Sequence, residues 1–471
     1  MIALTVSKLA ATLAVVSLAC ASLLAVEARP AKPTPAKQRP PNIVLIISDD
    51  QAWTDYGFMD HPVIRTPHLD KLASESAVFP HGYLPAASCR PSLASIITGL
   101  YPHQHGITGN DVAPPAKRPK GWLPQQDPDY MARCEALISK IDKLPTLPRL
   151  LATKGYVSHQ SGKWWEGHYS RSGFTEGMTH GDSKRGGRCG DDGLKIGREG
   201  MQPVFEFIDG AGDKPFFLWY APFLPHTPHT PPKRLLDKYR APDRPIELAR
   251  YYAMCEWFDA TCGELLGHID KRGLADNTVV VYVSDNGWIQ LTTGTKVPKG
   301  WRTPFAPRSK QSPYDGGVRT PILIRWPGHI EPARHGTLVT SLDIAPTLLS
   351  IAGVPKPSEM SGIDLLHACA GRPIQRDAVF GELYAHDIAD IDDPSRSLAY
   401  RWAVLGKWKL IRHYPGKLGR LAYMLKPREE YPQLYDIVTD PFERRNLANE
   451  KPSLVKRLHA RMDGVWKPRT E

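Results

Sequence analysis

Unbroken apolar segments alternate with amphipathic segments over most of this chain. Apolar runs at residues 42–47, 216–220 and 278–283 are typical of parallel strands buried on both faces. Residues 246–271 carry apolar side chains at helical spacing, and Gly273 predicts the end of that helix. The alternation of strand and helix predicts an α/β fold with a doubly wound, mostly parallel sheet.

The pattern changes beyond about residue 370. Two short strands are predicted at 400–405 and 408–411, followed by a strand at 434–437 and an amphipathic helix at 453–466. These elements predict a small antiparallel α+β subdomain. The predicted organisation is a signal peptide at 1–28, a proline-rich linker at 29–40, a large α/β domain at 41–370 and the C-terminal subdomain at 371–471.

The N-terminus has the pattern of an export signal. An apolar run at 9–24 precedes Val26-Glu27-Ala28, a small-x-small cleavage pattern. The run is short for a transmembrane helix, so no stable membrane span is expected. Ser17 stands where a lipoprotein signal needs an aliphatic residue before Cys20, which argues against lipidation. The chain is predicted to be exported to the periplasm or the extracellular space.

Cysteine number argues against a complete disulfide framework. Of the seven cysteines, Cys20 leaves with the signal, and reserving Cys89 for chemistry leaves an odd number. A Cys134–Cys189 bridge remains open. Cys255 and Cys262 lie two helical turns apart, roughly 10 Å, which is too far to bridge.

The net charge of +11 favours an anionic partner. No basic helix or aromatic stacking motif suggests nucleic acid, so an anionic small molecule or polysaccharide fits better. Simple solubility is the alternative explanation of the charge. A hydrophobic content of 41% excludes global disorder.

Two polar pairs follow predicted strands directly. Asp49 and Asp50 end the first strand, and Asp285 and Asn286 end the most apolar one. Ligand sites in open α/β sheets lie at the carboxyl ends of strands, so the pairs are expected to converge. Three carboxylates and an amide oxygen suit calcium or magnesium. Asp and Asn also begin ordinary turns, but two such pairs favour a metal site.

A short helix is predicted to begin just after Cys89. Pro91 suits the first helical position, and Gly99 suits the end. The helix N-terminus would attract sulfate or phosphate and lower the pKa of the Cys89 thiol. The alternative is a buried structural cysteine.

The segment Cys89-Arg90-Pro91-Ser92, with Thr98-Gly99-Leu100-Tyr101-Pro102, resembles the signature of the sulfatase family, which has an alkaline-phosphatase-like fold. The resemblance extends over roughly residues 40–470. It implies that a formylglycine-generating enzyme oxidises Cys89 to formylglycine during export, and that the hydrated aldehyde attacks the sulfur of a sulfate ester. The metal ligands implied by the resemblance are Asp49, Asp50, Cys89, Asp285 and Asn286.

Further site residues follow from the same resemblance. Gly162-Lys163-Trp164 and the segment around Lys310 match the positions of two sulfate-binding lysines, which would stabilise transition-state charge. Pro225-His226-Thr227-Pro228 matches the loop whose histidine protonates the leaving alcohol. His229 is a further expected substrate-binding residue. Each of these side chains has an alternative role as an ordinary solvated lysine or loop histidine.

Two positions depart from the family pattern. Leu93 stands where the family has an arginine that assists modification and braces the nucleophile. Trp165 stands where a histidine usually promotes release of sulfate, a role for which Glu166 or His168 is a candidate. These departures put modification and turnover in question.

Basic residues mixed with tryptophan occur at 110–143 and 289–309, which suits a sulfated carbohydrate, although exposed loops explain many of them. The sequence therefore predicts a sulfuric ester hydrolase acting on sulfated carbohydrate. The alternatives are a phosphodiesterase or phosphonate hydrolase with the same metal site, and a catalytically silent binder of sulfated glycans.

Overall fold

The computed structural model describes residues 39–182, 189–416 and 431–469. The predicted signal peptide and nearly all of the linker lie outside the described residues. The chain divides into two units, Met1–Arg39 and Pro40–Glu471, and everything below concerns the second. Among the described residues, no helix combines the length and apolar character of a membrane span.

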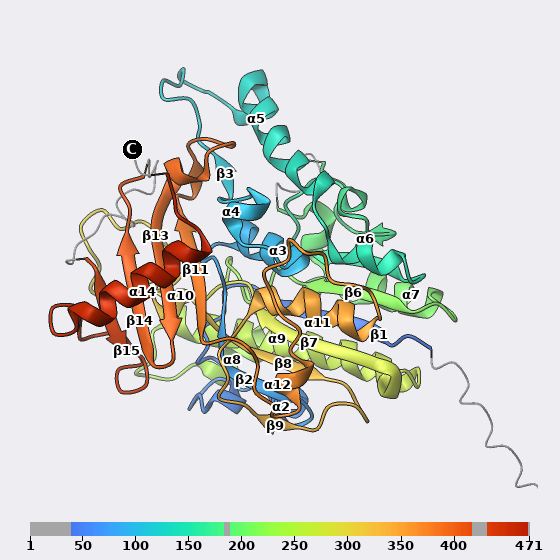
Figure 1. The fold of residues 1–471 in the computed structure, drawn as a ribbon. Helices are drawn as coiled ribbons and strands as arrows, with labels where there is room; N and C mark the ends of the chain where they lie inside the picture. The colour runs from blue at the N-terminus through green and yellow to red at the C-terminus, as the bar shows by residue number, and fades with distance from the viewer. Residues whose placement is uncertain (1–38, 183–188, 417–430, 470–471) are drawn as a thin grey trace, which may run out of the picture. The chain divides into compact units, whose positions relative to one another are not determined.

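A nine-stranded sheet runs through the described part of this unit (Figure 1). The strand order is β10 (Val339–Thr340), β2 (Ala77–Tyr83), β8 (Arg319–Arg325), β7 (Thr278–Ser284), β1 (Asn42–Ser48), β6 (Phe216–Ala221), β4 (Val157–Gly162) and β5 (Glu176–Gly177), with β9 (Ala333–Arg334) beside β2. β1 pairs in parallel with both β6 and β7, whereas β8 is antiparallel to β7 and β2. The prediction of a mostly parallel sheet is confirmed.

Helices cover both faces of this sheet. Side chains of β1 alternate between two apolar clusters, with Ile43 and Leu45 in one and Val44 and Ile46 in the other. The first cluster includes α3 (Cys89–Thr98), α6 (Leu147–Ala152) and α11 (Ile344–Ile351); the second includes α2 (Pro67–Ser74), α7 (Gln202–Gly210) and α9 (Ile246–Lys271). The doubly wound arrangement is therefore confirmed, and α9 has the predicted bounds.

The C-terminal strands form a separate antiparallel sheet in the order β11 (Ala378–Tyr384), β13 (Leu398–Leu405), β14 (Trp408–His413) and β15 (Gln433–Asp436). Helix α14 (Pro452–Val465) packs Leu458 and Met462 against one face. The other face packs Trp402 against Tyr83 of the larger sheet. The predicted antiparallel strands are confirmed, while the boundary at residue 370 stays a prediction.

Shorter elements connect these layers. They are β3 (Asp111–Val112), which pairs with β12 (Asp387–Ile388), and α4 (Pro102–His105), α5 (Pro128–Ile138), α8 (Lys233–Tyr239), α10 (Asp315–Val318) and α12 (Leu366–Cys369).

The open question of a Cys134–Cys189 bridge is settled by the thiol at Cys134, which belongs to no disulfide. Cys255 and Cys262 on α9 are buried and form no disulfide, in agreement with their helical spacing.

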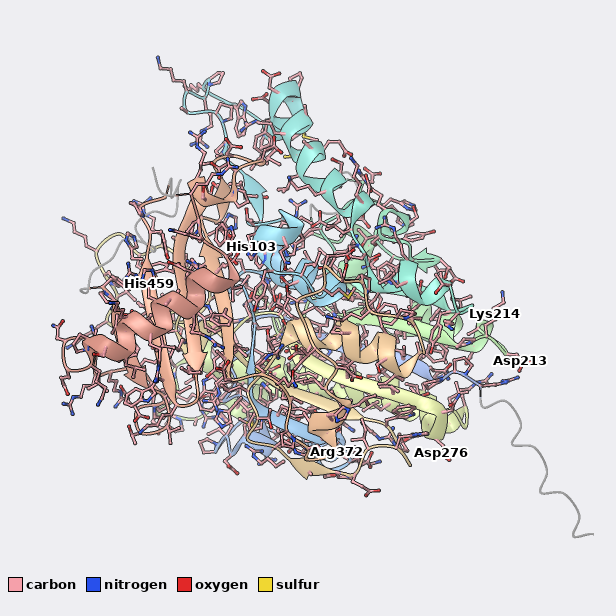
Figure 2. The ribbon with its side chains drawn as sticks, in the orientation of Figure 1. His103, Asp213, Lys214, Asp276, Arg372 and His459 are labelled. Atoms are coloured by element: carbon pink, nitrogen blue, oxygen red, sulfur yellow. The ribbon has the colours of Figure 1, made fainter. Side chains whose placement is uncertain are left out.

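Helix α4 ties the helix that carries Cys89 to the C-terminal sheet. His103 (labelled in Figure 2) stacks on Trp466 with ring centroids 4.7 Å apart, and its ring pairs with Glu382 of β11. His105 lies on the opposite side, where Ile107 N–H donates to its Nδ1 (3.0 Å). Its Nε2–H therefore donates to Ser95 Oγ of α3 (3.0 Å).

We expect His105 to make folding sensitive to acid. Burial lowers the pKa of His105 to about 3 in the folded chain, against about 6.5 when unfolded. Its contribution to stability is therefore complete above pH 6.5 and is lost as pH falls, by about 2 kcal/mol at pH 5. In urea unfolding, the stability gap between parent and a His105→Gln variant should narrow by that amount from pH 7 to pH 5. Equal gaps at both pH values would contradict this prediction.

Candidate active site

The two polar pairs predicted to hold a metal converge at one edge of the sheet. β1 and β7 are parallel with Ser48 opposite Ser284, so the residues that follow both strands leave at the same end. Asp50 adopts a left-handed φ of 63°, which Asp tolerates, and its N–H donates to Asp285 Oδ1 (3.1 Å). Asn286 Nδ2 donates to Asp50 Oδ1 (2.6 Å). Parallel pairing in this register therefore builds the acidic cluster.

Cys89 lies against this cluster. Its Sγ is 3.3 Å from Asn286 Oδ1 and 3.1 Å from Lys310 Nζ. Helix α3 begins at Cys89 itself, so Pro91 is the third helical residue and not the first. Gly99 ends the helix with a left-handed φ of 65°, as predicted.

The expected lowering of the Cys89 pKa is wrong. Burial raises the pKa of the thiol to about 12, although Lys163 and Lys310 partly offset this effect. The side chain is only 1% exposed, so loss of solvation outweighs the helix N-terminus and the two ammonium groups. Unmodified Cys89 is therefore a neutral thiol at pH 7, which is a weak nucleophile.

Both predicted lysines reach the cluster. Lys163 follows the end of β4 and donates to both oxygens of Asp49, at 2.7 Å each. Lys310 Nζ donates to Asp50 Oδ1 at 2.5 Å. Burial alone would lower the pKa of each lysine, but the carboxylates raise it above its usual range. Both ammonium groups are therefore charged and held in place.

Three buried carboxylates share these two ammonium groups. Burial and repulsion from Asp285 raise the pKa of Asp49 to about 7, and burial likewise raises the pKa of Asp285. Burial also opposes ionisation of Asp50, but Lys310, His226 and Lys163 together hold its pKa below the usual range. With three carboxylates and two ammonium groups, the cluster has one carboxylate without an ammonium partner of its own.

The cluster fits a hard divalent cation. Asp50 Oδ2 and Asp285 Oδ2 are buried and accept no hydrogen bond from the described residues. Asp49, Asp50, Cys89 and His226 offer ligand atoms that lie within 4.8 Å of one another. Oxygen-rich sites with excess negative charge suit calcium or magnesium, and the unsatisfied oxygens are where such an ion would gain most.

The two predicted histidines have different surroundings. His226 Nε2 lies 3.3 Å from Asp50 Oδ2, and its ring stacks on Phe223 (4.2 Å). Its side chain is 20% exposed, so the cluster opens to solvent at this residue. His229 instead packs against Tyr251 (5.5 Å) and Trp288 (5.8 Å). Burial lowers the pKa of both histidines to about 4.

Arg198 supports the His226 loop and was missed in the sequence. Its guanidinium donates to His226 O and Phe223 O, each at 2.8 Å, and lies over the Phe223 ring (5.2 Å). Residue 198 belongs to no motif, so only the tertiary structure reveals this contact.

Leu93 and Trp165, the two departures from the family pattern, have buried surroundings. Leu93 and Trp165 join the apolar cluster that contains Cys89. Glu166, a candidate for the missing histidine's role, instead binds Arg90 through two hydrogen bonds of 2.8 and 2.7 Å. His168, the other candidate, bonds Ser170 Oγ (2.8 Å). The buried Arg90–Glu166 pair thus connects the start of α3 to the segment after Lys163.

Breaking this pair should be costly. A Glu166→Gln variant keeps the shape but leaves Arg90 buried without a counter-charge, which should cost about 3–5 kcal/mol in the free energy of unfolding. A matched control is Glu135→Gln, because Glu135 pairs with Arg171 at the surface, where loss of a pair costs about 1 kcal/mol or less. Similar losses in denaturant unfolding of the two variants would refute the prediction.

The two stretches in which basic residues mix with tryptophan, 110–143 and 289–309, have different surroundings. Arg118 and Trp122 line a cavity of about 440 Å³ whose wall also includes Arg90, Trp164 and Trp165, the sequence neighbours of Cys89 and Lys163. In the second stretch, Arg308 bonds Glu443 O and lies over Tyr314 (4.5 Å), while Trp301 packs on Phe305 (6.1 Å). The first stretch therefore borders a cavity near the candidate site, whereas the second makes intramolecular contacts.

Comparison with known proteins agrees with this arrangement. The sulfatase family model matches residues 41–354, which is more than half of the chain, and the model for the N-sulphoglucosamine sulphohydrolase C-terminal region matches residues 308–467. N-acetylgalactosamine-6-sulfatase of Canis lupus familiaris is 28% identical over 453 residues, covering 86% of this chain and 81% of that protein.

Solved structures share the fold. Ps i-CgsB superposes with a TM-score of 0.68 at 23% identity, covering 92% of this chain and 94% of its own. The phosphonate monoester hydrolase of Agrobacterium radiobacter superposes with a TM-score of 0.64 at 18% identity, covering 90% and 95%. Likeness of fold does not identify the family, but the family match does. This chain belongs to the sulfatase family of enzymes that hydrolyse sulfate esters, and it has their alkaline-phosphatase-like fold.

Proposed function

We propose that this chain hydrolyses sulfate esters of carbohydrate with a formylglycine nucleophile made from Cys89. A calcium or magnesium ion would be held by Asp49, Asp50, Asp285 and Asn286, beside the residue derived from Cys89. The observation that carries the proposal is the contact of Cys89 Sγ with both Asn286 (3.3 Å) and Lys310 (3.1 Å) at the edge of the acidic cluster.

The state of Cys89 argues against the thiol itself as the nucleophile. A thiol with a pKa of about 12 supplies almost no thiolate at neutral pH. Formylglycine would supply a hydroxyl nucleophile at the same position. A formylglycine-generating enzyme is accordingly the expected maturation partner, acting during export to the periplasm or extracellular space.

The lysines account for sulfate binding. Lys163 and Lys310 are fixed by carboxylates before substrate arrives, so they present two charges without further ordering. Preorganised charge of this kind stabilises the charge that develops on sulfate oxygens. A bound cation would add to this by neutralising sulfate charge and acting as a Lewis acid.

His226 is placed to protonate the leaving alcohol at the open side of the cluster. Burial keeps the ring neutral, with a pKa of about 4. An anionic sulfate ester beside the ring would raise that pKa and favour a proton on Nε2. His229 packs on Tyr251 and Trp288 beside the cluster, where we propose that it contacts substrate.

Two features support a carbohydrate substrate. The canine relative is named N-acetylgalactosamine-6-sulfatase, after a sugar. In the cavity beside the candidate site, Arg118 lies 5.8 Å over the Trp122 ring. An aromatic face and a guanidinium suit a sugar ring and an anionic substituent.

Substrate preference tests the proposal. The sulfate, phosphate diester and phosphonate monoester of one phenolic leaving group should be compared by kcat/KM. We expect the sulfate ester to be hydrolysed most efficiently. A preference for either phosphorus ester would favour the phosphodiesterase or phosphonate hydrolase alternative.

Metal removal should abolish activity and lower stability. Chelation leaves three buried carboxylates with two ammonium groups, so the melting temperature should fall and return when calcium is added. An Asp49→Ala/Asp285→Ala variant should lose the ion. A control is Asp259→Asn, since buried Asp259 accepts hydrogen bonds from the start of α2 and lies outside the cluster. Full metal content in the double variant, measured by elemental analysis, would contradict the ligand assignment.

A further inference from the structure

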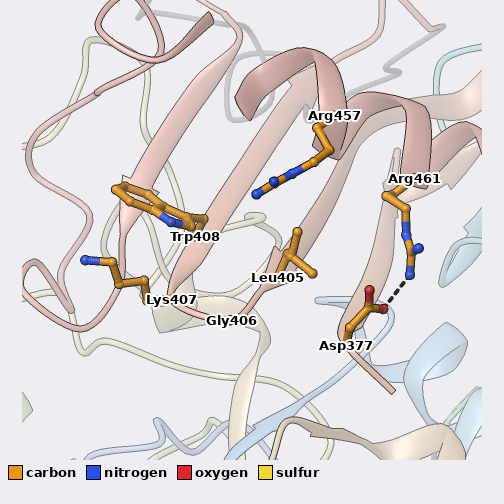
Figure 3. Close-up of a pocket in the computed structure, with 7 residues that line it drawn as sticks. All are labelled: Asp377, Leu405, Gly406, Lys407, Trp408, Arg457 and Arg461. Atoms are coloured by element: carbon orange, nitrogen blue, oxygen red, sulfur yellow. Dashed lines mark hydrogen bonds and ion pairs between the residues drawn. The ribbon is translucent and has the colours of Figure 1, made fainter. Parts of the chain in front are cut away.

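A basic groove lies on the C-terminal sheet, between α14 and the turn that joins β13 to β14 (Figure 3). Its volume is about 620 Å³. The residues that line it are Asp377, Leu405, Gly406, Lys407, Trp408, Arg457 and Arg461. Helix α14 packs on the face of the sheet opposite to the one that contacts Tyr83 and Tyr314. The groove is therefore separate from the Cys89 site.

Cationic side chains in the groove are not all neutralised. Arg461 pairs with Asp377 at the rim, and Lys407 pairs with Asp436 (2.6 Å). Arg457 extends from α14 toward Trp408 and makes no hydrogen bond or ion pair with any described residue (Figure 3). As far as the described residues go, the groove thus offers a guanidinium whose donors are available.

Two arginines on helix α14 repel each other. Arg457 and Arg461 are four residues apart on one face, where like charges repel and destabilise a helix. Two more ammonium groups, of Lys407 and Lys451, lie 4.8 and 5.2 Å from the Trp408 ring centroid. An anion bound beside Arg457 would reduce the repulsion that remains.

We propose that this groove binds a sulfated segment of a polysaccharide at a distance from the active site. The inference rests on the proposed function, because it takes the ligand to be the polymeric form of the same substrate class. Arg457 would bind sulfate through paired N–H donors, Arg461 would add positive charge beside its pair with Asp377, and the apolar faces of Trp408 and Leu405 would contact sugar rings. A groove of this volume accommodates a ligand of one or a few sugar rings.

Such a site would keep a polymer attached while another segment of it occupies the active site. Linking two binding events on one polymer raises the effective concentration of the second segment. The groove should therefore lower the KM for a polymer and leave hydrolysis of a small sulfate ester unchanged.

The test is binding of the full chain to chondroitin sulfate and dextran sulfate, with unsulfated chondroitin and polyglutamate as comparison polymers. We expect an Arg457→Ala/Arg461→Ala variant to lose about tenfold in affinity for at least one sulfated polymer. Lys456→Ala is the matched control, since Lys456 is exposed on the same helix and does not line the groove. It should change affinity less than twofold.

Equal affinity of the parent and the double variant for both sulfated polymers would overturn the proposal. So would a parent that binds neither polymer, or one that binds polyglutamate as tightly, because the groove would then select charge and not a sulfated glycan. Hydrolysis of a small sulfate ester is measured separately. If the chain hydrolyses this ester but fails the binding test, only the proposal for the groove is refuted. If it binds the polymers but does not hydrolyse the ester, the proposed function is refuted.

Discussion

Replacing Lys163 or Lys310 by methionine is expected to lower turnover of a sulfate ester by roughly a hundredfold or more. Each ammonium group is buried and held by a carboxylate, Lys163 by Asp49 and Lys310 by Asp50. Loss of one preorganised charge at the transition state typically costs about 3 kcal/mol. Methionine retains most of the apolar stem but leaves a buried carboxylate without its ammonium partner, so the kcat of the folded protein should fall and stability should fall with it. Steady-state kinetics with a small sulfate ester, beside denaturant unfolding, checks both.

A matched control separates charge at the site from burial of a lysine in general. Lys409 is fully buried and pairs with Asp315 (2.7 Å) and Glu443 (2.9 Å) beneath the C-terminal sheet. A Lys409→Met variant should lose stability and retain kcat in its folded fraction. Parent-level turnover by the Lys163→Met and Lys310→Met variants would show that the lysine roles are wrong.

Replacing Cys89 by alanine is expected to reduce hydrolysis by roughly a thousandfold or more, because the proposed nucleophile is then absent. The substitution removes one sulfur atom at the start of α3, beside Asn286 and Lys310. Metal binding should persist, since the carboxylates remain. Turnover and metal content of the purified variant are the two measurements.

Cys262→Ala supplies the control for this change. Cys262 is a buried thiol in the apolar cluster around α9, and its loss should cost about 1–2 kcal/mol of stability without lowering turnover. Substantial hydrolysis by Cys89→Ala would overturn the nucleophile assignment.

The main sheet could be predicted because its strands are apolar on both faces. The runs beginning at Asn42, Phe216 and Thr278 became β1, β6 and β7, which are adjacent in the sheet. Polar residues directly after two such strands predicted the acidic cluster, since parallel neighbours end at the same edge. The positions of Lys163 and Lys310 in that cluster came from family resemblance, because a lone lysine carries no pattern of its own.

Other features depend on contacts between distant segments. Arg90 and Glu166 are 76 residues apart, and no periodicity indicates that they form a buried pair. The contact of Arg198 with the His226 loop is similarly invisible in sequence. The Cys89 pKa was predicted in the wrong direction because a helix start is visible in sequence, whereas the extent of burial is not.

We expect Cys89 to become formylglycine although Leu93 stands where the family has an arginine. Mass spectrometry of the Cys89 peptide tests it most directly, using full-length protein exported from a host that contains the modifying enzyme. A Leu93→Arg variant prepared in parallel shows whether residue 93 limits conversion. We expect an aldehyde at position 89 in the parent, in proportion to its sulfate-ester hydrolysis. An unmodified thiol at position 89 in the parent, with or without hydrolysis of the ester, would contradict this expectation.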